Sequence, residues 1–167
     1  PLHRPSGVAS DGRRLLVVSG DKVVVVDPDS KSATDLIVSD LAAPIGLAVD
    51  TEANVYVSDW ADQMCVKKFS PDGRLVQTFG KIGGRPWMGP YDPSGMILPR
   101  GISVDPQGRL WVAEDYASPR RMSCWNPDGS LAFEKYGTTW YSGDGCYIFP
   151  DQPERAFFNG AFVDLDW

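Results

Sequence analysis

The chain has 167 residues, enough for one domain with a sizeable core, and 16 Lys and Arg against 22 Asp and Glu give it a formal net charge of −6. This acidic balance, without a basic stripe to neutralise phosphates, argues against a general nucleic-acid binder. The longest apolar runs have the length of single strands, so we expect no membrane span.

A motif of Pro-x-Gly, an apolar residue, two more residues and Asp divides the chain into repeats. Nearly intact copies begin at Pro44 and Pro99, and a degraded copy begins at Pro5. We expect the Gly of each motif to let the chain enter an innermost strand where neighbouring units crowd together. The predicted repeats cover residues 5–43, 44–98 and 99–137, followed by a divergent part, 138–167.

Short strands rich in Val, Tyr, Trp and Phe follow each motif, separated by Asp-Gly and Pro-Asp-Gly turns. No segment has sustained helical periodicity. A fourth strand is indicated only in the second and third repeats, at 75–80 and 131–137. The divergent part predicts a strand, an Asn159-Gly160 hairpin turn and a second strand. The other expected strands are 15–20 and 23–26, 55–59 and 66–69, and 109–114 and 122–125.

Four short strands per repeat are typical of a propeller blade, so we predict an all-β fold, a β-propeller of four-stranded antiparallel blades. Closed propellers usually have about four to eight such blades. Three repeats and a partial one indicate an incomplete piece, about 3.5 blades, of a six-bladed propeller. A closed four-bladed ring and an assembly of partial propellers are the alternatives. We expect the remaining blades of a longer chain, or a second copy, to complete the ring.

The repeat resembles the NHL repeat. Residues 44–80 and 99–137 carry its pattern well, 5–37 partially and 138–167 only loosely. The chain departs from the family at the Asn-His-Arg-like step after the second strand, where it has residues 62–64 and 118–121. The resemblance implies a propeller fold. It does not imply one function, because the family includes protein-binding scaffolds, sensor domains, RNA binders and a few lyases.

In a propeller, the loops between strands 2 and 3 and the entries to strand 1 gather on one face around the axial channel. Acid, aromatic and Arg side chains that converge there suit a polar ligand or a cation. Asp59 and Glu114 also have a structural alternative, since a carboxylate at a strand end accepts backbone N–H bonds; the first repeat has Gly20 at this position. The candidate residues on this face are Arg100, Asp59, Trp60, Glu114, Asp115 and Tyr116.

An insertion separates the second and third repeats. The spacing from Gly46 to Gly101 is 55 residues, against 39 from Gly7 to Gly46, so about a dozen extra residues lie near 81–98. Gly and Pro predict a loop, and aromatic and Met side chains suit an interface. The alternative is that Trp87 and Met88 plug the channel or pack on a neighbouring blade. The candidate binding residues of the insertion are Trp87 and Tyr91, and a second aromatic loop lies at 139–142.

Other chemistry is sparse. The only histidine, His3, lies near the chain terminus, which leaves catalysis by a histidine base without a candidate. The three cysteines have no metal-binding spacing and are expected to be buried free thiols rather than bridged. The paired cations 13–14, 67–68 and 120–121 are interpreted as solvated charges at strand ends. The cysteines are Cys65, Cys124 and Cys146.

We therefore expect a binding or scaffold propeller that holds a protein, a glycan or a small polar ligand through the channel-face loops and the insertion at 81–98. The alternative is a metal-dependent propeller enzyme, similar to gluconolactonase-type lactonases or the hydroxyglycine amidating lyase, with a divalent cation on the axis. A purely architectural segment is the third hypothesis. No other cofactor is expected, and an extracytoplasmic location, secreted or periplasmic, is favoured.

Overall fold

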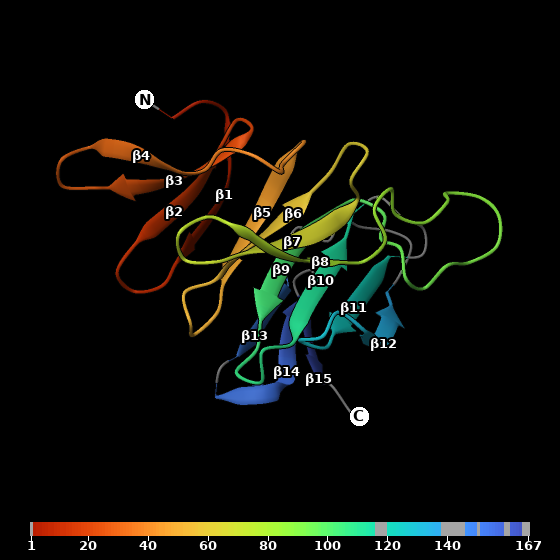
Figure 1. Ribbon diagram of the computed structural model, residues 1–167. Coiled ribbons are helices and arrows are strands. Elements are labelled where there is room, and N and C mark those ends of the chain that lie inside the picture. The colour runs from red at the N-terminus through yellow and green to blue at the C-terminus, as the bar shows by residue number, and fades with distance from the viewer. Residues whose placement is uncertain (1, 116–119, 138–145, 150, 159–160, 165–167) are drawn as a thin grey trace.

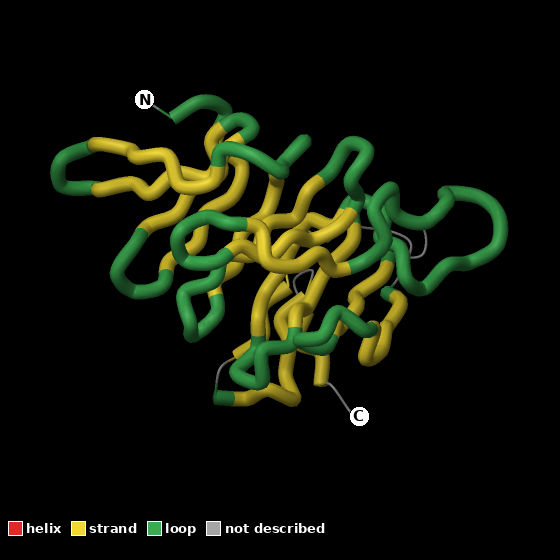
Figure 2. Tube along the Cα trace, viewed as in Figure 1, coloured by secondary structure: helices red, strands yellow, loops and turns green. Residues whose placement is uncertain are grey.

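The computed structural model describes residues 2–115, 120–137, 146–149, 151–158 and 161–164. These residues form strands and loops without any helix, as Figure 2 shows. None of them therefore belongs to an apolar helix of membrane-spanning length. Four antiparallel sheets follow one another along the chain, as the predicted propeller requires (Figure 1).

Three of the sheets are complete four-stranded blades in which each strand pairs with the next one in the sequence. Blade 1 contains β1 (Pro5–Ser10), β2 (Leu15–Ser19), β3 (Lys22–Asp27) and β4 (Ser32–Ile37). Blade 2 contains β5 (Pro44–Val49), β6 (Val55–Asp59), β7 (Cys65–Phe69) and β8 (Leu75–Phe79). Blade 3 contains β9 (Pro99–Val104), β10 (Leu110–Glu114), β11 (Arg121–Trp125) and β12 (Leu131–Tyr136).

The last sheet has three strands among the described residues. They are β13 (Cys146–Phe149), β14 (Gln152–Phe158) and β15 (Ala161–Asp164), in that order across the sheet. The two strands expected around the Asn-Gly turn correspond to β14 and β15, and the turn itself, 159–160, lies outside the described residues. The motif-less strand β13 adds a third.

Blade 1 contains a strand that the sequence did not indicate. Blade 1 has a fourth strand, β4, although its sequence Ser-Ala-Thr-Asp-Leu-Ile lacks the apolar pattern of the other strands. Four of its six residues are exposed, because an outermost strand is paired on one side only and lies at the rim of the blade. β4 forms because its backbone pairs with β3, and its own side chains do not predict a strand.

The Gly of each Pro-x-Gly motif lies where two innermost strands approach each other. A Cβ atom at Gly7 would be 2.4 Å from the carbonyl oxygen of Ile45, and one at Gly46 would be 2.2 Å from that of Arg100. Neither distance leaves room for a side chain. Glycine is therefore required where β1 contacts β5 and where β5 contacts β9. The prediction for this glycine is confirmed at both positions.

Each Pro-x-Gly step also interrupts the regular pairing of strands 1 and 2, and this fixes the register. The first turn is one residue shorter than the turns that follow Asp50 and Asp105. Ser19, and not Gly20 as the sequence comparison assumed, therefore occupies the strand-end position. The motif prolines pair with equivalent residues: Pro5 with Ser19, Pro44 with Asp59 and Pro99 with Glu114.

Alternating residues of each strand face the two neighbouring blades, so the core is a series of layers between sheets. The layer between blades 1 and 2 contains Leu16, Val18, Leu47, Val57 and Phe69. The layer between blades 2 and 3 contains Tyr56, Phe79, Ile102, Val112 and Trp125. The layer between blade 3 and the last sheet contains Trp111, Ala113, Cys124 and Ala156.

Two of the three cysteines behave as expected. Cys65 and Cys124 are buried, and neither of them forms a disulfide. Burial raises the pKa of the Cys65 thiol to about 11, so this thiol remains protonated and unreactive at neutral pH. The side chain of Cys146 lies outside the part of the chain that the structure describes.

Candidate functional site

The strand-end carboxylate of blade 2 is fully buried and holds the chain that enters the blade. Asp59 accepts hydrogen bonds from the backbone N–H groups of Ala42, at 3.0 Å, and Ala43, at 2.7 Å. The Nζ atom of Lys67 lies 2.8 Å from the Asp59 carboxylate and also donates to the carbonyl oxygen of Asp40. These contacts are those of the structural role that the sequence offered as the alternative for Asp59, in which the carboxylate accepts backbone N–H bonds at the strand end.

The equivalent carboxylate in blade 3 joins the blade to the insertion. Glu114 is fully buried, accepts a hydrogen bond from the backbone N–H of Ile97, and pairs with the guanidinium groups of Arg85 and Arg121. Burial raises the pKa of Glu114, and the two guanidinium groups oppose this effect. Glu114 therefore binds three groups at once, two of them in the insertion.

A second buried carboxylate follows directly. Asp115 lies between Arg100, whose Nη1 is 2.7 Å from Oδ2, and Arg120, whose Nη1 is 3.3 Å from Oδ1. Its backbone N–H donates to the carbonyl oxygen of Leu98. The Arg100 side chain is 38% exposed, whereas the carboxylate of Asp115 has no exposed surface. The structure thus brings the predicted residues Arg100 and Asp115 together, with the arginine at the surface.

The remaining predicted residues of this face differ in position. Trp60 is half-buried, and its indole N–H donates to the carbonyl oxygen of Pro99 at 2.6 Å, which ties blade 2 to β9. Tyr116 lies outside the described residues, as does the second aromatic loop at 139–142. Trp60 is therefore a contact between blades.

The carboxylates offered for an axial cation are each occupied by protein cations. Asp59 pairs with Lys67, Glu114 with two arginines, and Asp115 with two more. In the described ranges no three His, Cys, Asp or Glu side chains are grouped so that they could hold a metal ion. A cation would have to displace buried partners, which leaves charges uncompensated.

Two charge pairs were misjudged from the sequence. Lys67, Arg120 and Arg121 were interpreted as solvated, but all three are buried beside carboxylates. The sequence also did not indicate that Arg85 pairs with Glu114, or that Glu134 pairs with Arg121. One signal was available: β11 begins with Arg121 where β7 begins with Cys65, so blade 3 places a charge at a position that is buried in both blades.

The insertion is anchored from below by the fully buried Arg121. Its Nη1 donates to the carbonyl oxygen of Gly95 at 2.6 Å, and its Nη2 donates to that of Pro93 at 2.7 Å. Its Nε lies 2.8 Å from Glu134, which also accepts a hydrogen bond from the hydroxyl of Tyr91. The predicted binding residue Tyr91 therefore holds the insertion through its hydroxyl group, while the residue is 50% exposed.

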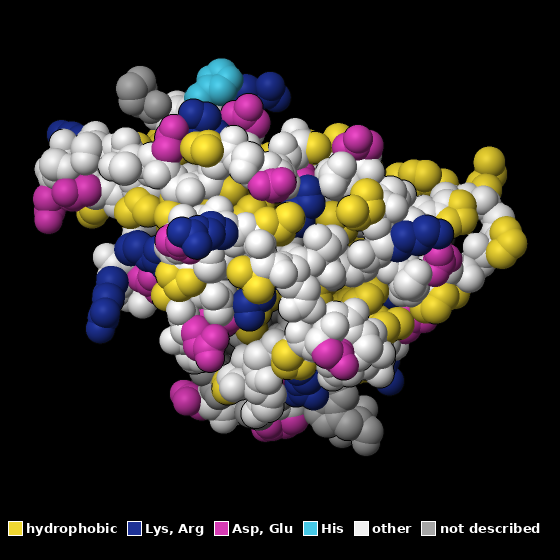
Figure 3. Space-filling view, viewed as in Figure 1, with side chains coloured by type: hydrophobic (Ala, Val, Ile, Leu, Met, Phe, Trp, Pro, Cys, Tyr) yellow, Lys and Arg dark blue, Asp and Glu magenta, His cyan; other side chains and the backbone are white. Residues whose placement is uncertain are grey.

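The outer side of the insertion exposes large apolar side chains. Trp87 is 60% exposed and Met88 is 90% exposed, so neither is buried against the blades that the structure describes. Figure 3 shows hydrophobic side chains along the loop that projects between β8 and β9. We call this set the apolar rim; its members are Ile82, Trp87, Met88 and Tyr91.

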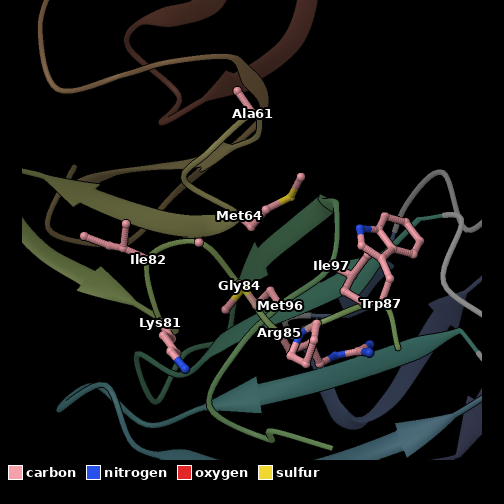
Figure 4. Close-up of a pocket in the computed structure, with 11 residues that line it drawn as sticks. Ala61, Met64, Lys81, Ile82, Gly84, Arg85, Trp87, Met96 and Ile97 are labelled. Atoms are coloured by element: carbon pink, nitrogen blue, oxygen red, sulfur yellow. The ribbon is translucent and has the colours of Figure 1, made fainter. Parts of the chain in front are cut away.

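A hollow of about 520 Å³ lies beside the apolar rim, between the β6–β7 turn and the start of the insertion (Figure 4). Met64, Met96, Ile97 and Trp87 are among its apolar lining residues. Its size falls within the range of small-molecule sites.

The fold resembles solved β-propeller structures. A structure of a nidogen/laminin complex superimposes with a TM-score of 0.65 at 18% identity, over 93% of this chain and 60% of that one. A streptogramin B lyase gives a TM-score of 0.65 at 18% identity, over 95% and 48%. A gluconolactonase from Xanthomonas campestris gives 0.65 at 22% identity, over 96% and 55%.

These likenesses establish the propeller fold and leave the activity open, since they include a binding protein and two enzymes. The chain spans between 48% and 60% of the length of these three structures. No family model matches the chain, and no curated protein matches it in sequence.

Proposed function

We propose that this chain is a propeller binding module that holds a protein partner on the apolar rim. The observation that carries the proposal is a loop fixed by buried charges that nevertheless turns four large apolar side chains toward solvent. Exposed Trp and Met on a rigid support suit a protein interface, because Trp buries a large area for little lost conformational freedom and the flexible Met side chain adapts to its partner.

The insertion is held by side-chain and backbone contacts, and this favours a binding role. Arg85 and Arg121 pair with different oxygens of the Glu114 carboxylate, and their guanidinium carbons lie 5.7 Å and 6.0 Å from the centroid of the Tyr91 ring. Backbone hydrogen bonds close the base of the loop, from Lys81 N to Ser94 O and from Arg85 N to Met96 O. A surface held in this way loses little entropy when a partner binds.

Arg100 lies at the strand 1 entry of blade 3. It is the exposed member of the Arg100–Asp115 pair, and arginine is enriched at interfaces. We propose it as a polar contact at the edge of the partner site. Glu114 and Asp115 support the insertion through their bonds to Ile97, Arg85 and Leu98. Trp60 holds Pro99, and Asp59 holds the chain that enters blade 2. The metal-dependent enzyme is the weaker candidate because each of these carboxylates already has a cationic partner.

We also propose that the repeats are of the NHL type and belong to a six-bladed propeller. The support is the Pro-x-Gly motif, whose glycines lie at the contact between innermost strands, together with the partial coverage of longer propellers. In the assembled ring the free face of blade 1 would be covered by a further blade, from the same chain or a second copy. The nidogen/laminin complex is an example of a propeller in a complex with a protein partner.

The proposal is tested by affinity capture from the source organism, with identification of the bound proteins and then titration of one purified partner. The variant Trp87→Ser/Met88→Ser is compared with Val76→Ser, a similarly exposed apolar residue on the outer strand of blade 2. We expect the double variant to weaken partner binding by a factor of about 100 while its circular dichroism and melting remain unchanged. Equal binding by the double variant and the control would refute the proposal.

A further inference from the structure

The hollow beside the apolar rim is lined by apolar side chains and by two cationic residues. Met64 comes from the β6–β7 turn, Met96 and Ile97 from the end of the insertion, and Trp87 from its exposed part (Figure 4). Lys81 and Arg85 are the cationic residues of the lining, and no carboxylate is among the described residues that line it. An apolar cavity with cations at its margin matches a molecule with an apolar body and an acid group.

The second observation is an incomplete hydrogen-bond set on Arg85. Its side chain is nine-tenths buried, and its Nη2 pairs with Glu114. Its Nε is buried without a hydrogen-bond acceptor in the part of the chain that the structure describes. A buried guanidinium N–H without an acceptor is costly, and Arg85 is one of the residues that line the hollow.

The hollow is formed before any ligand arrives, because its wall is fixed by backbone contacts. Gly83 N donates to Gln63 O, and Gly84 N donates to Lys81 O, both at 2.9 Å. Gly84 has φ +69°, and a Cβ atom there would lie 2.2 Å from the carbonyl oxygen of Met96. Only glycine allows the insertion to approach so closely, and this approach shapes one side of the hollow.

We propose that this hollow binds a small amphipathic carboxylate, with the apolar body against Met64, Ile97 and Trp87 and the acid group toward Lys81 and Arg85. Lys81 is available for this role because its pair with Asp92 is largely exposed, and exposed ion pairs exchange at little cost. This site is separate from the protein partner in chemistry, although Trp87 belongs to both surfaces.

Phenylbutyrate and the neutral phenylbutanol are suitable probes because they share their apolar body and differ in the acid group. Binding is followed by two-dimensional NMR of the whole chain, through the backbone amide signals of Gly83, Gly84 and Ile97. We expect saturable binding of phenylbutyrate with a dissociation constant of about 1 mM or lower. We expect phenylbutanol to bind about tenfold more weakly.

The variant Lys81→Gln should weaken phenylbutyrate binding by about threefold to fivefold and leave phenylbutanol unchanged. Lys22→Gln is the matched control, because Lys22 also forms an exposed ion pair, with Asp35 of blade 1, far from the hollow. Equal binding of the acid and the alcohol, shifts confined to other residues, or no effect of Lys81→Gln would each overturn the proposal. Since Lys81→Gln keeps Trp87 and Met88, such a failure would leave the partner proposal to its own test.

Discussion

Individual residues of the repeat have structural roles that follow from where two chain segments meet. Gly46 carries the Pro-x-Gly motif of blade 2 against the backbone of Arg100, and Ser58 reinforces the same contact. The Ser58 hydroxyl accepts a hydrogen bond from Gly46 N and donates one to Arg100 O. The structural role of Gly46 and Ser58 therefore follows from their contact with the backbone of the neighbouring innermost strand.

The variant Gly46→Ala should destabilise the protein by about 3 kcal/mol, because the new methyl group overlaps a carbonyl oxygen that cannot move away from its strand. Gly12→Ala is the comparison: Gly12 has φ +81° with open space around it, so only backbone strain of about 1 kcal/mol is expected. Urea unfolding measures both. Equal losses would show that the close approach to Arg100 is not what selects glycine.

Acid stability depends in part on Asp11. Hydrogen bonds from the backbone and side chain of Arg14 hold the pKa of this carboxyl at about 2, below its ordinary value of 3.8. Because the folded-state pKa is the lower one, Asp11 stabilises the fold above pH 4, and this contribution is lost as the pH falls from 4 to 2. Asp11→Asn should flatten that part of the stability profile in denaturant titrations. A profile unchanged from wild type, or one equally flattened in Asp35→Asn, would contradict this.

At the scale of elements, the insertion is the part that the blade pattern does not demand. Its base is pinned by Arg121 of β11, and its outer side carries the apolar rim. The sequence showed that extra residues were present and that they were aromatic. It did not show the anchor, because Arg121 and the carbonyl groups it binds are separated by 26 and 28 residues.

Removing the anchor should loosen the insertion. Arg121→Met leaves Glu114 and Glu134 without this guanidinium and should cost about 3–5 kcal/mol. Arg121→Lys keeps the charge and tests the contacts to Pro93 and Gly95 by themselves. In both variants, hydrogen exchange at Lys81 N and Arg85 N should accelerate more than exchange within β5 and β6.

The control for this prediction is Arg109→Met. Arg109 is another ion-paired arginine of blade 3, bonded to Asp105 at the opposite end of the strands. It should lower stability without a selective effect on exchange in the insertion. Uniform acceleration in all of these variants would show that Arg121 contributes to the blade as a whole and does not anchor the loop.

For the whole molecule, the equivalent positions on the innermost strands show which face of the blade series is free. Val8, Leu47 and Ile102 pair with matching residues of the second strands. Leu47 and Ile102 are each 8% exposed because a neighbouring blade covers them, whereas Val8 is 64% exposed. Blade 1 therefore presents to solvent the face that blades 2 and 3 bury.

Val8→Asp should change the free energy of unfolding of the 167-residue chain by less than about 0.5 kcal/mol. Leu47→Asp, at the equivalent buried position, should cost about 3 kcal/mol or more, because it buries an unpaired charge. We also expect the wild-type chain to self-associate in sedimentation experiments, and Val8→Asp to reduce this association. A wild-type chain that stays monomeric at all concentrations would argue against an unsatisfied blade face.

The sequence by itself determined the repeat, the blades and the role of the Pro-x-Gly glycine, since turns and alternating apolar residues are local properties of the chain. It did not reveal β4, whose strand is held by pairing with β3 and not by its own side chains. Only the tertiary structure decided which charges are buried, since Arg85, Glu114 and Arg121 meet only when the insertion folds across blade 3. The same folding leaves Trp87 and Met88 exposed on the insertion, whose contacts with blade 3 include the charge pairs of Arg85 and Arg121 with Glu114.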